Sequence, residues 1–217
     1  MILEISRSKL QKLVINQIES LFTLSHGKER NILLSCIDMA LERSEYCFSY
    51  TKNKYYSKDG ETYFNPFHSG QNSIFLYFLS NSIFSSYPEA HNLADRVYYL
   101  NKTLNGLDLF YQVEMPSIFF LDHPVGSVLG RAKYSERFSF SQNCTVGNNK
   151  GIYPTFGQNV KMMAGSKVLG NCRIGSNVII SANSYIKDFD IPSCSLVFGI
   201  SPNLVIKIKD EEYFKDA

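Results

Sequence analysis

The sequence predicts an α+β fold, in which an α-helical domain over residues 1–106 precedes a parallel β-helix over residues 107–206 and a short tail over residues 207–217. Three observations predict this division. Apolar residues recur with a helical period in the first half, they recur at every sixth position in the second half, and the period changes near residue 110. The chain has 217 residues, of which 44% are hydrophobic, so it has enough apolar material for one compact domain or two unequal ones.

The first half is predicted to contain three helices. One apolar stripe covers residues 10–22 and a second covers residues 33–41, each with the spacing of an amphipathic helix. Pro88 opens a third candidate, which ends at the stop signal Asn105-Gly106. The segment 55–70 is rich in polar residues, glycine and proline, and is therefore predicted to be a loop.

The second half carries a hexapeptide repeat. Its apolar anchors keep a period of six, with one excursion of four extra residues between Val146 and Phe156. In a triangular solenoid each hexad forms one flat side, its anchor points into the core, and a small residue fits the corner. The period therefore predicts stacked coils that bury one another. The anchors are Tyr134, Phe140, Val146, Phe156, Met162, Val168, Ile174, Ile180 and Ile186.

The charge, hydropathy and cysteine content of the sequence limit which ligands, partners and compartments are expected. The net charge is +2, with acidic and basic residues mixed along the chain, so neither nucleic acid nor an anionic membrane is predicted as a partner. No segment approaches about 18 uninterrupted apolar residues, so no membrane span is expected. Five scattered cysteines indicate free thiols in a reducing cytoplasm. Some hexapeptide solenoids carry metal-dependent hydration chemistry, which needs three imidazole ligands. The second half holds only His123, so no metal is expected unless one His from each of three subunits converges.

Four segments resemble the serine acetyltransferases and their hexapeptide acyltransferase relatives, a family with a left-handed β-helix. Leu121-Asp122-His123, followed by Gly126, is similar to the family's catalytic segment, and residues 163–171 are similar to its coenzyme-binding hexads. Residues 198–202 resemble its closing segment, and Asn65-Pro66 resembles the segment that ends its helical domain. The resemblance covers roughly residues 64–206 and implies an acetyl-CoA-dependent O-acetyltransferase.

His123 is the predicted catalytic base. Acyl transfer from a thioester to a hydroxyl needs a base whose pKa lies near neutrality, and imidazole has that property. A carboxylate should orient the ring. The family's spacing places this carboxylate at Asp108, whereas the local sequence around Glu114 resembles the same segment with one hexad missing, and Glu114 is preferred. Asp122 would then flank the acceptor. The alternative for His123 is an ordinary residue at a solenoid corner.

The resemblance implies a coenzyme site between the solenoids of a homotrimer, with the helical domains pairing trimers in a larger assembly. Backbone groups near Ala164, Gly165 and Ala182 would contact the pantetheine arm of acetyl-CoA, because small residues allow close approach. Asn148 belongs to the same predicted site. The ammonium groups of Lys167 and Lys187 would reach the phosphates, unless they only cover solvated faces of the solenoid.

The acceptor site departs from the family. Serine acetyltransferases hold a carboxylate with an Arg-His pair before a proline, and here Ile152 and Tyr153 precede Pro154. Asn65 replaces the family's aspartate. A neutral pocket that includes Asn65, His68 and Tyr153 favours a hydroxyl of a sugar or of a surface-polysaccharide precursor as the acceptor. L-serine is the alternative acceptor, and a scaffold that has lost the reaction is a third reading.

Overall fold

The computed structural model describes residues 1–25 and 27–215. The chain divides into two compact units. The first comprises Met1–Gly106 and Phe110–Gln112, and the second comprises Leu107–Leu109 and Val113–Ala217, of which the last two residues lie outside the description. Each unit has its own buried apolar core. In the described part of the chain, no helix is long and apolar enough to cross a lipid bilayer.

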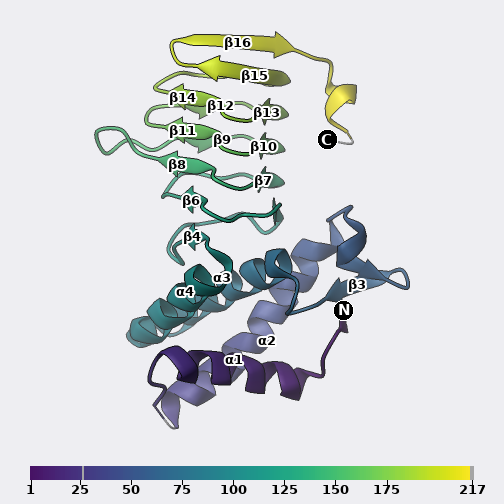
Figure 1. Ribbon diagram of the computed structural model, residues 1–217, viewed down its shortest axis with the longest axis vertical. Helices are drawn as coiled ribbons and strands as arrows, with labels where there is room; N and C mark the ends of the chain where they lie inside the picture. Colours follow the sequence, from purple (N-terminus) through teal and green to yellow (C-terminus); the bar gives the residue numbers. More distant parts are fainter. Residues whose placement is uncertain (26, 216–217) are drawn as a thin grey trace. The chain divides into compact units, whose positions relative to one another are not determined.

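The helical unit contains α1 (Arg7–Leu21), α2 (Lys28–Ser49), α3 (Ser69–Ser86) and α4 (His91–Asn105), which follows a 3₁₀ turn at Pro88–Ala90 (Figure 1). The three helices that the apolar stripes predict are confirmed as α1, α2 and α4. In contrast, α3 was not predicted, because it lacks a one-sided stripe. Its residues 70–80 are buried all round, and it packs against both α2 and α4.

The prediction of a loop over residues 55–70 is wrong in part. After a 3₁₀ turn at Lys54–Tyr56, the chain forms β2 (Ser57–Lys58) and β3 (Glu61–Phe64), and α3 begins at Ser69. β3 pairs in parallel with β1 (Ile2–Leu3) at the start of the chain. A pairing between segments this far apart cannot be read from local composition, since both strands are short and mostly not buried.

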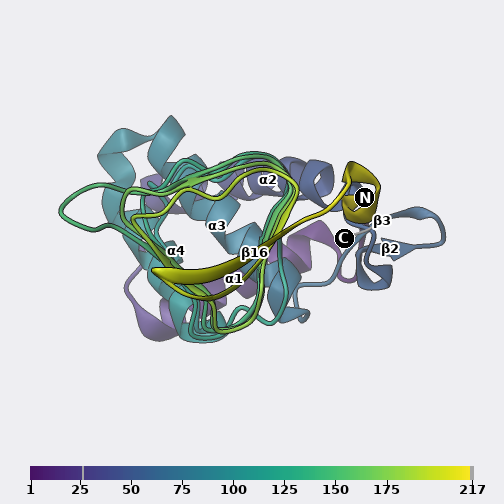
Figure 2. The same cartoon turned by 90° about the horizontal axis from the view of Figure 1, so that it is seen from above.

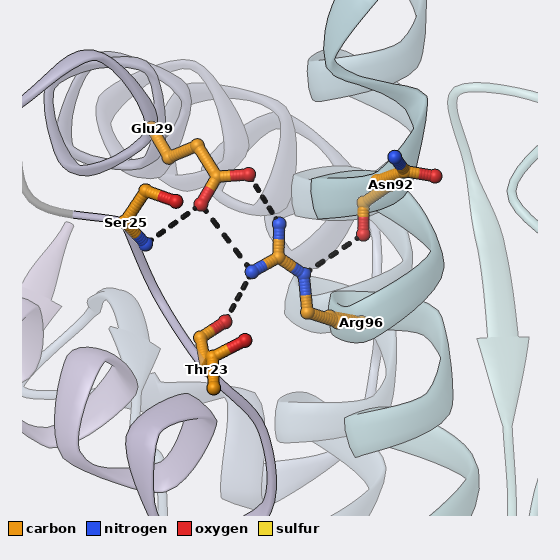
Figure 3. Close-up of polar contacts among 5 residues, drawn as sticks. All are labelled: Thr23, Ser25, Glu29, Asn92 and Arg96. Carbon is orange, nitrogen blue, oxygen red and sulfur yellow. Dashed lines mark hydrogen bonds and ion pairs between the residues drawn. The ribbon is translucent and has the colours of Figure 1, made fainter.

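Arg96 on α4 holds the connection between α1 and α2 (Figure 3). Its guanidinium donates two hydrogen bonds to the Glu29 carboxylate, one of them at 3.3 Å, and further hydrogen bonds to the carbonyl oxygens of Thr23 and, at 2.9 Å, Asn92. The backbone N–H of Ser25 donates to Glu29 at 2.8 Å. The hydrogen bond from Arg96, helped by that from Ser25, lowers the pKa of Glu29 below its ordinary value.

The second unit is a parallel β-solenoid. One side stacks β4 (Asp108–Leu109), β6 (Val128–Leu129), β8 (Thr145–Gly147), β11 (Lys167–Leu169) and β14 (Tyr185–Lys187). A second side stacks β5 (Phe119–Leu121), β7 (Phe138–Phe140), β10 (Val160–Met162) and β13 (Val178–Ile180), and a third pairs β9 (Thr155–Phe156) with β12 (Arg173–Ile174). Figure 2 shows the coils superposed along the stack. β15 (Ser195–Ile200) continues two sides, and antiparallel β16 (Asn203–Ile208) and a 3₁₀ turn at Glu211–Phe214 follow it.

The register of the strands confirms the hexapeptide period. Met162 pairs with both Phe140 and Ile180, so that anchors stack on anchors in successive coils. All the predicted anchors are buried except Tyr134, which is half-buried and stacks its ring on Phe156 at a centroid distance of 5.4 Å. The four-residue excursion leaves the stack between β8 and β9 as a loop (Figure 1). The solenoid begins earlier than Tyr134, because β4, β5 and β6 belong to it although their spacing is irregular.

Candidate active site

One corner of the solenoid gathers several predicted site residues. Corner A is the set of turns after β5, β7, β10 and β13, at residues 122–127, 141–144, 163–166 and 181–184. Backbone hydrogen bonds connect these turns from coil to coil: Asn143 N to Val125 O at 3.0 Å, Gly165 N to Gln142 O at 2.9 Å, and Asn183 N to Ala164 O at 2.9 Å. His123, Ala164, Gly165 and Ala182 therefore lie along one edge.

His123 projects from corner A into solvent. Its backbone has a φ of +50°, in the left-handed region, and a hydrogen bond from Val125 N to His123 O at 2.8 Å closes the turn. The buried residues Leu121 and Pro124 anchor this turn on both sides. The imidazole is 85% exposed, so a substrate can reach it. This geometry suits a base that contacts a bound acceptor.

Asp122 is the carboxylate that contacts His123. Its Oδ1 lies 3.6 Å from His123 Nε2, and the Asp122 side chain is 61% exposed. Glu114 is exposed between the buried residues Val113 and Met115, in the segment that joins β4 to β5. Among the described residues, no hydrogen bond or ion pair joins its carboxylate to His123. Asp108 lies in β4, paired with Val128. The assignment of Glu114 or Asp108 as the orienting carboxylate remains a prediction.

Glycine and asparagine alternate along corner A in a pattern that the sequence analysis missed. Gly165 has a φ of +72°, and a Cβ on it would come 2.4 Å from Asn183 Oδ1. Earlier in the stack, a Cβ on Gly126 would come 2.3 Å from Asn143 Oδ1. The asparagines also adopt positive φ, a conformation that asparagine tolerates better than most residues. The recurrence of Gly and Asn at turn positions was the available signal for this corner.

The predicted coenzyme residues divide between two corners. Lys167 opens β11 beside corner A, and its ammonium donates to Gly165 O at 3.0 Å. Lys187 ends β14 at the other edge of the same side, paired with Leu169. Asn148 also lies at that edge, called corner B, which comprises the turns at residues 148–154, 170–172 and 188–191. The structure thus brings Lys167, but neither Lys187 nor Asn148, to the corner of His123.

Tyr153 belongs to the excursion loop at corner B, residues 148–153. Asn148 Nδ2 donates to Tyr153 Oη at 3.3 Å. The Tyr153 ring lies against Gly130, where a Cβ would come 3.3 Å from Tyr153 Cε1. Ile152 at the loop is 51% exposed. The loop therefore carries the phenol of Tyr153, the amide of Asn148 and the apolar side chain of Ile152.

The other two predicted acceptor residues lie in the helical unit, where both have structural roles. Asn65 Oδ1 accepts from Phe67 N at 2.9 Å, which forms the turn before α3. His68 is the N-cap of α3, and its Nδ1 accepts from Gln71 N at 3.3 Å. Gln71 is fully buried, and its Oε1 accepts from Asn65 N at 2.6 Å. A role of Asn65 and His68 toward an acceptor remains a prediction.

Comparison with known proteins agrees with the coil geometry. Residues 153–188 match the family model for the bacterial transferase hexapeptide (six repeats). The second unit is a hexapeptide-repeat solenoid. This chain is similar to the serine acetyltransferase of Staphylococcus aureus, with 27% identity over 154 residues. That alignment covers 64% of this chain and 66% of the relative, just under two thirds of the relative's length.

Solved serine acetyltransferases have the same fold as this hexapeptide-repeat protein. The structure from Vibrio cholerae matches with a TM-score of 0.72 at 17% identity, covering 94% of this chain and 80% of that one. The structure from Brucella abortus in complex with coenzyme A matches with a TM-score of 0.67 at 22% identity, covering 92% and 82%. Helices followed by a parallel β-solenoid are thus the shared architecture.

Proposed function

We propose that this protein is an acetyl-CoA-dependent O-acetyltransferase with His123 as its general base and L-serine as its acceptor. The observation that carries the proposal is the shared corner: His123 is exposed on the same solenoid edge as Ala164, Gly165 and Ala182. A thioester bound along that edge would present its carbonyl near the imidazole. The similar Brucella abortus structure is a complex with coenzyme A, which supports this choice of acyl donor.

The reaction follows from the chemistry of imidazole. His123 takes the proton of the acceptor hydroxyl as its oxygen attacks the thioester carbonyl, and a tetrahedral intermediate forms. When the intermediate collapses, the C–S bond breaks and the coenzyme A thiolate leaves. The imidazolium returns the proton to the sulfur, so the products are an acetyl ester and free coenzyme A. Asp122, 3.6 Å from the ring, stabilises the imidazolium between these steps.

The choice of L-serine reverses the order in which the sequence analysis ranked the acceptors. Relatives from Staphylococcus aureus and Staphylococcus epidermidis, each 27% identical to this chain, are serine acetyltransferases. One observation still favours a neutral acceptor: Ile152 and Tyr153 carry no charge that would hold a carboxylate. An acceptor hydroxyl on a sugar is therefore the second candidate.

The assembly belongs to the same proposal. His123 lies at corner A and the excursion loop lies at corner B of one solenoid, separated by a side whose strands span about 10 Å at roughly 3.3 Å per residue. In a homotrimer, corner A of one copy and corner B of another would line one groove, with acetyl-CoA between them. Lys187 and Asn148 would then contribute to the coenzyme site from the second copy.

Thiol release from acetyl-CoA tests the proposal. The wild type is expected to release thiol with L-serine faster than with a panel of sugars and oligosaccharides. His123→Ala should lower kcat by about 100-fold to 10,000-fold, as expected for the loss of a general base. His91→Ala, an exposed position on α4, is the matched control and should retain the wild-type rate.

Three results would contradict parts of the proposal. Turnover of a sugar in preference to L-serine would assign the second candidate. An unchanged rate in His123→Ala would remove the role of this residue. A wild type that releases no thiol with any acceptor would identify a scaffold without activity.

A further inference from the structure

We propose that Asp188 is a positioning residue for the acceptor, because its carboxylate holds the excursion loop through Asn149. This inference rests on the proposed function and on the role predicted for Tyr153, a residue of that loop, in the acceptor pocket. Asp188 lies at corner B, directly after β14, and belongs to a later coil of the solenoid than the loop. Asp188 is not an anchor of the hexapeptide period, and the proposed reaction gives it no catalytic role.

The loop is built as a small, stiff unit. Asn149 and Ile152 exchange both backbone hydrogen bonds at 3.0 Å, which closes a two-residue turn. The central residues Lys150 and Gly151 have φ values of +52° and +80°, as a type I′ turn requires. Asn148 Oδ1 accepts from Gly151 N at 3.2 Å while its Nδ2 donates to Tyr153 at 3.3 Å. These hydrogen bonds connect Asn149 to the rest of the loop, so a contact that restrains Asn149 also restrains the Tyr153 phenol.

Asp188 joins this unit to the solenoid with its two carboxylate oxygens. Oδ2 accepts from Asn149 Nδ2 at 2.5 Å, and Oδ1 accepts from the backbone N–H of Asn171 at 2.8 Å. The hydrogen bond from Asn171, followed by that from Asn149 and the charges of Lys187 and Lys150, lowers the pKa of Asp188 below its ordinary value. The carboxylate is thus ionised at neutral pH, and an ionised oxygen accepts stronger hydrogen bonds than a neutral one.

Gly170 makes room for this contact. A Cβ at Gly170 would come 2.1 Å from Asp188 Oδ1 and 2.7 Å from Asn149 Cβ, and its φ is +81°. Its N–H donates to the carbonyl oxygen of Gly147, the last residue before the loop, at 3.0 Å. A glycine at this point therefore lets the carboxylate, the asparagine and the base of the loop converge in three successive coils.

Asp190 shows that the contact with the loop is specific. It lies two residues further along the same turn, and its Oδ1 also accepts a backbone N–H of the preceding coil, from Arg173 at 2.8 Å. Within the described residues, no hydrogen bond or ion pair connects Asp190 to the excursion loop. Both aspartates therefore stabilise corner B, whereas Asp188 alone of the two reaches Asn149.

Asn149→Ala is the sharpest test, because it removes the link to the loop and leaves the bond between Asp188 and Asn171 intact. Lys150 is exposed at the tip of the loop and provides a trypsin site there. We expect cleavage after Lys150 to accelerate by roughly three- to tenfold, in line with the loss of one exposed hydrogen bond to a charged group. The KM for L-serine should rise by a similar factor.

Asp188→Gly should also accelerate cleavage, by at least as much as Asn149→Ala, because it removes the hydrogen bond from Asn171 as well as the link to the loop. Glycine accepts the φ of +49° at this position. Asp190→Asn is the matched control and should change neither cleavage nor the KM for the acceptor. Unchanged cleavage in Asn149→Ala would overturn the inference, and so would faster cleavage with an unchanged KM for L-serine. If the wild type turns over no acceptor, the proposed function and the acceptor role fall together, whereas cleavage still decides whether Asp188 holds the loop.

Discussion

The backbone conformation of single residues at the corners shapes the candidate site. His123, Asn143, Gly165 and Asn183 all have positive φ and all lie at corner A. A residue in this region suffers a contact between its Cβ and its own backbone that glycine avoids. Small or short polar side chains at these positions leave the corner open beside His123. The small side chains at corner A therefore shape the candidate site together with His123.

Gly165→Ala tests the importance of this open corner. The substitution adds a Cβ at a φ of +72° and 2.4 Å from Asn183 Oδ1, so we expect the free energy of unfolding to fall by about 1–3 kcal/mol. The KM for acetyl-CoA should rise. Gly151→Ala is the control, because its φ of +80° is similar but no atom lies within 4 Å of the added Cβ. Equal losses in the two variants would show that the neighbour Asn183 is unimportant.

The pattern of buried residues differs between the strands of the solenoid and the helix α3 of the helical unit. A strand of the solenoid alternates, so that Val160 and Met162 of β10 point into the core while Lys161 points outward. α3 has no outward face over residues 70–80, because other helices pack on both sides of it. Alternation and period are visible in the sequence, whereas burial on all sides erases the pattern that would reveal a helix.

Met162→Ala tests the stacking of anchors in the solenoid. Met162 is fully buried between Phe140 and Ile180 of the neighbouring coils, so truncation leaves a cavity within the stack. We expect a loss of about 2–5 kcal/mol in the free energy of unfolding, measured with denaturant. Lys161→Ala in the same strand should change it by less than about 0.5 kcal/mol. A loss below about 1 kcal/mol for Met162→Ala would show that the coils close over the cavity.

At the scale of the whole molecule, the chain is two units with separate cores, and stability has to be followed for each. Far-ultraviolet circular dichroism reports mainly the helices and is suited to the first unit. In that unit, the pair formed by Glu29 and Arg96 connects α4 to the segment between α1 and α2 (Figure 3). Both side chains are partly buried, which reduces screening by solvent.

This pair predicts a pH dependence of the helical unit. Folding lowers the pKa of Glu29, so its contribution to stability is complete above the pKa of the unfolded chain and is lost as the pH falls through the folded pKa. Glu29→Gln should cost about 1 kcal/mol near pH 7, and this difference should shrink below about pH 4. Arg96→Met should show the same pH dependence. A difference from the wild type that persists unchanged at low pH would contradict the assignment.

Spacing along the chain was sufficient to predict the main features of the fold. The helices α1, α2 and α4, the hexapeptide period, the buried anchors and the excursion of four residues all follow from local patterns, because burial repeats at every turn of a helix or coil. These features are periodic, and a period can be counted without knowing which segments meet. His123 and the small residues near Ala164 were predicted differently, from their resemblance to segments of the serine acetyltransferases.

Only the tertiary structure revealed which residues meet. It placed His123 on the edge of Gly165 and Ala182, moved Lys187 and Asn148 to the other corner, and brought Asp188 to Asn149 across 39 positions of the chain. It also showed that β1 pairs with β3 and that α3 is buried between α2 and α4. Each of these contacts joins segments that are distant in the chain. In the solenoid the partners depend on how the coils stack, and one inserted loop changes that offset without changing any local pattern. In the helical unit they depend on long-range pairing and on burial from several sides, which local patterns do not encode.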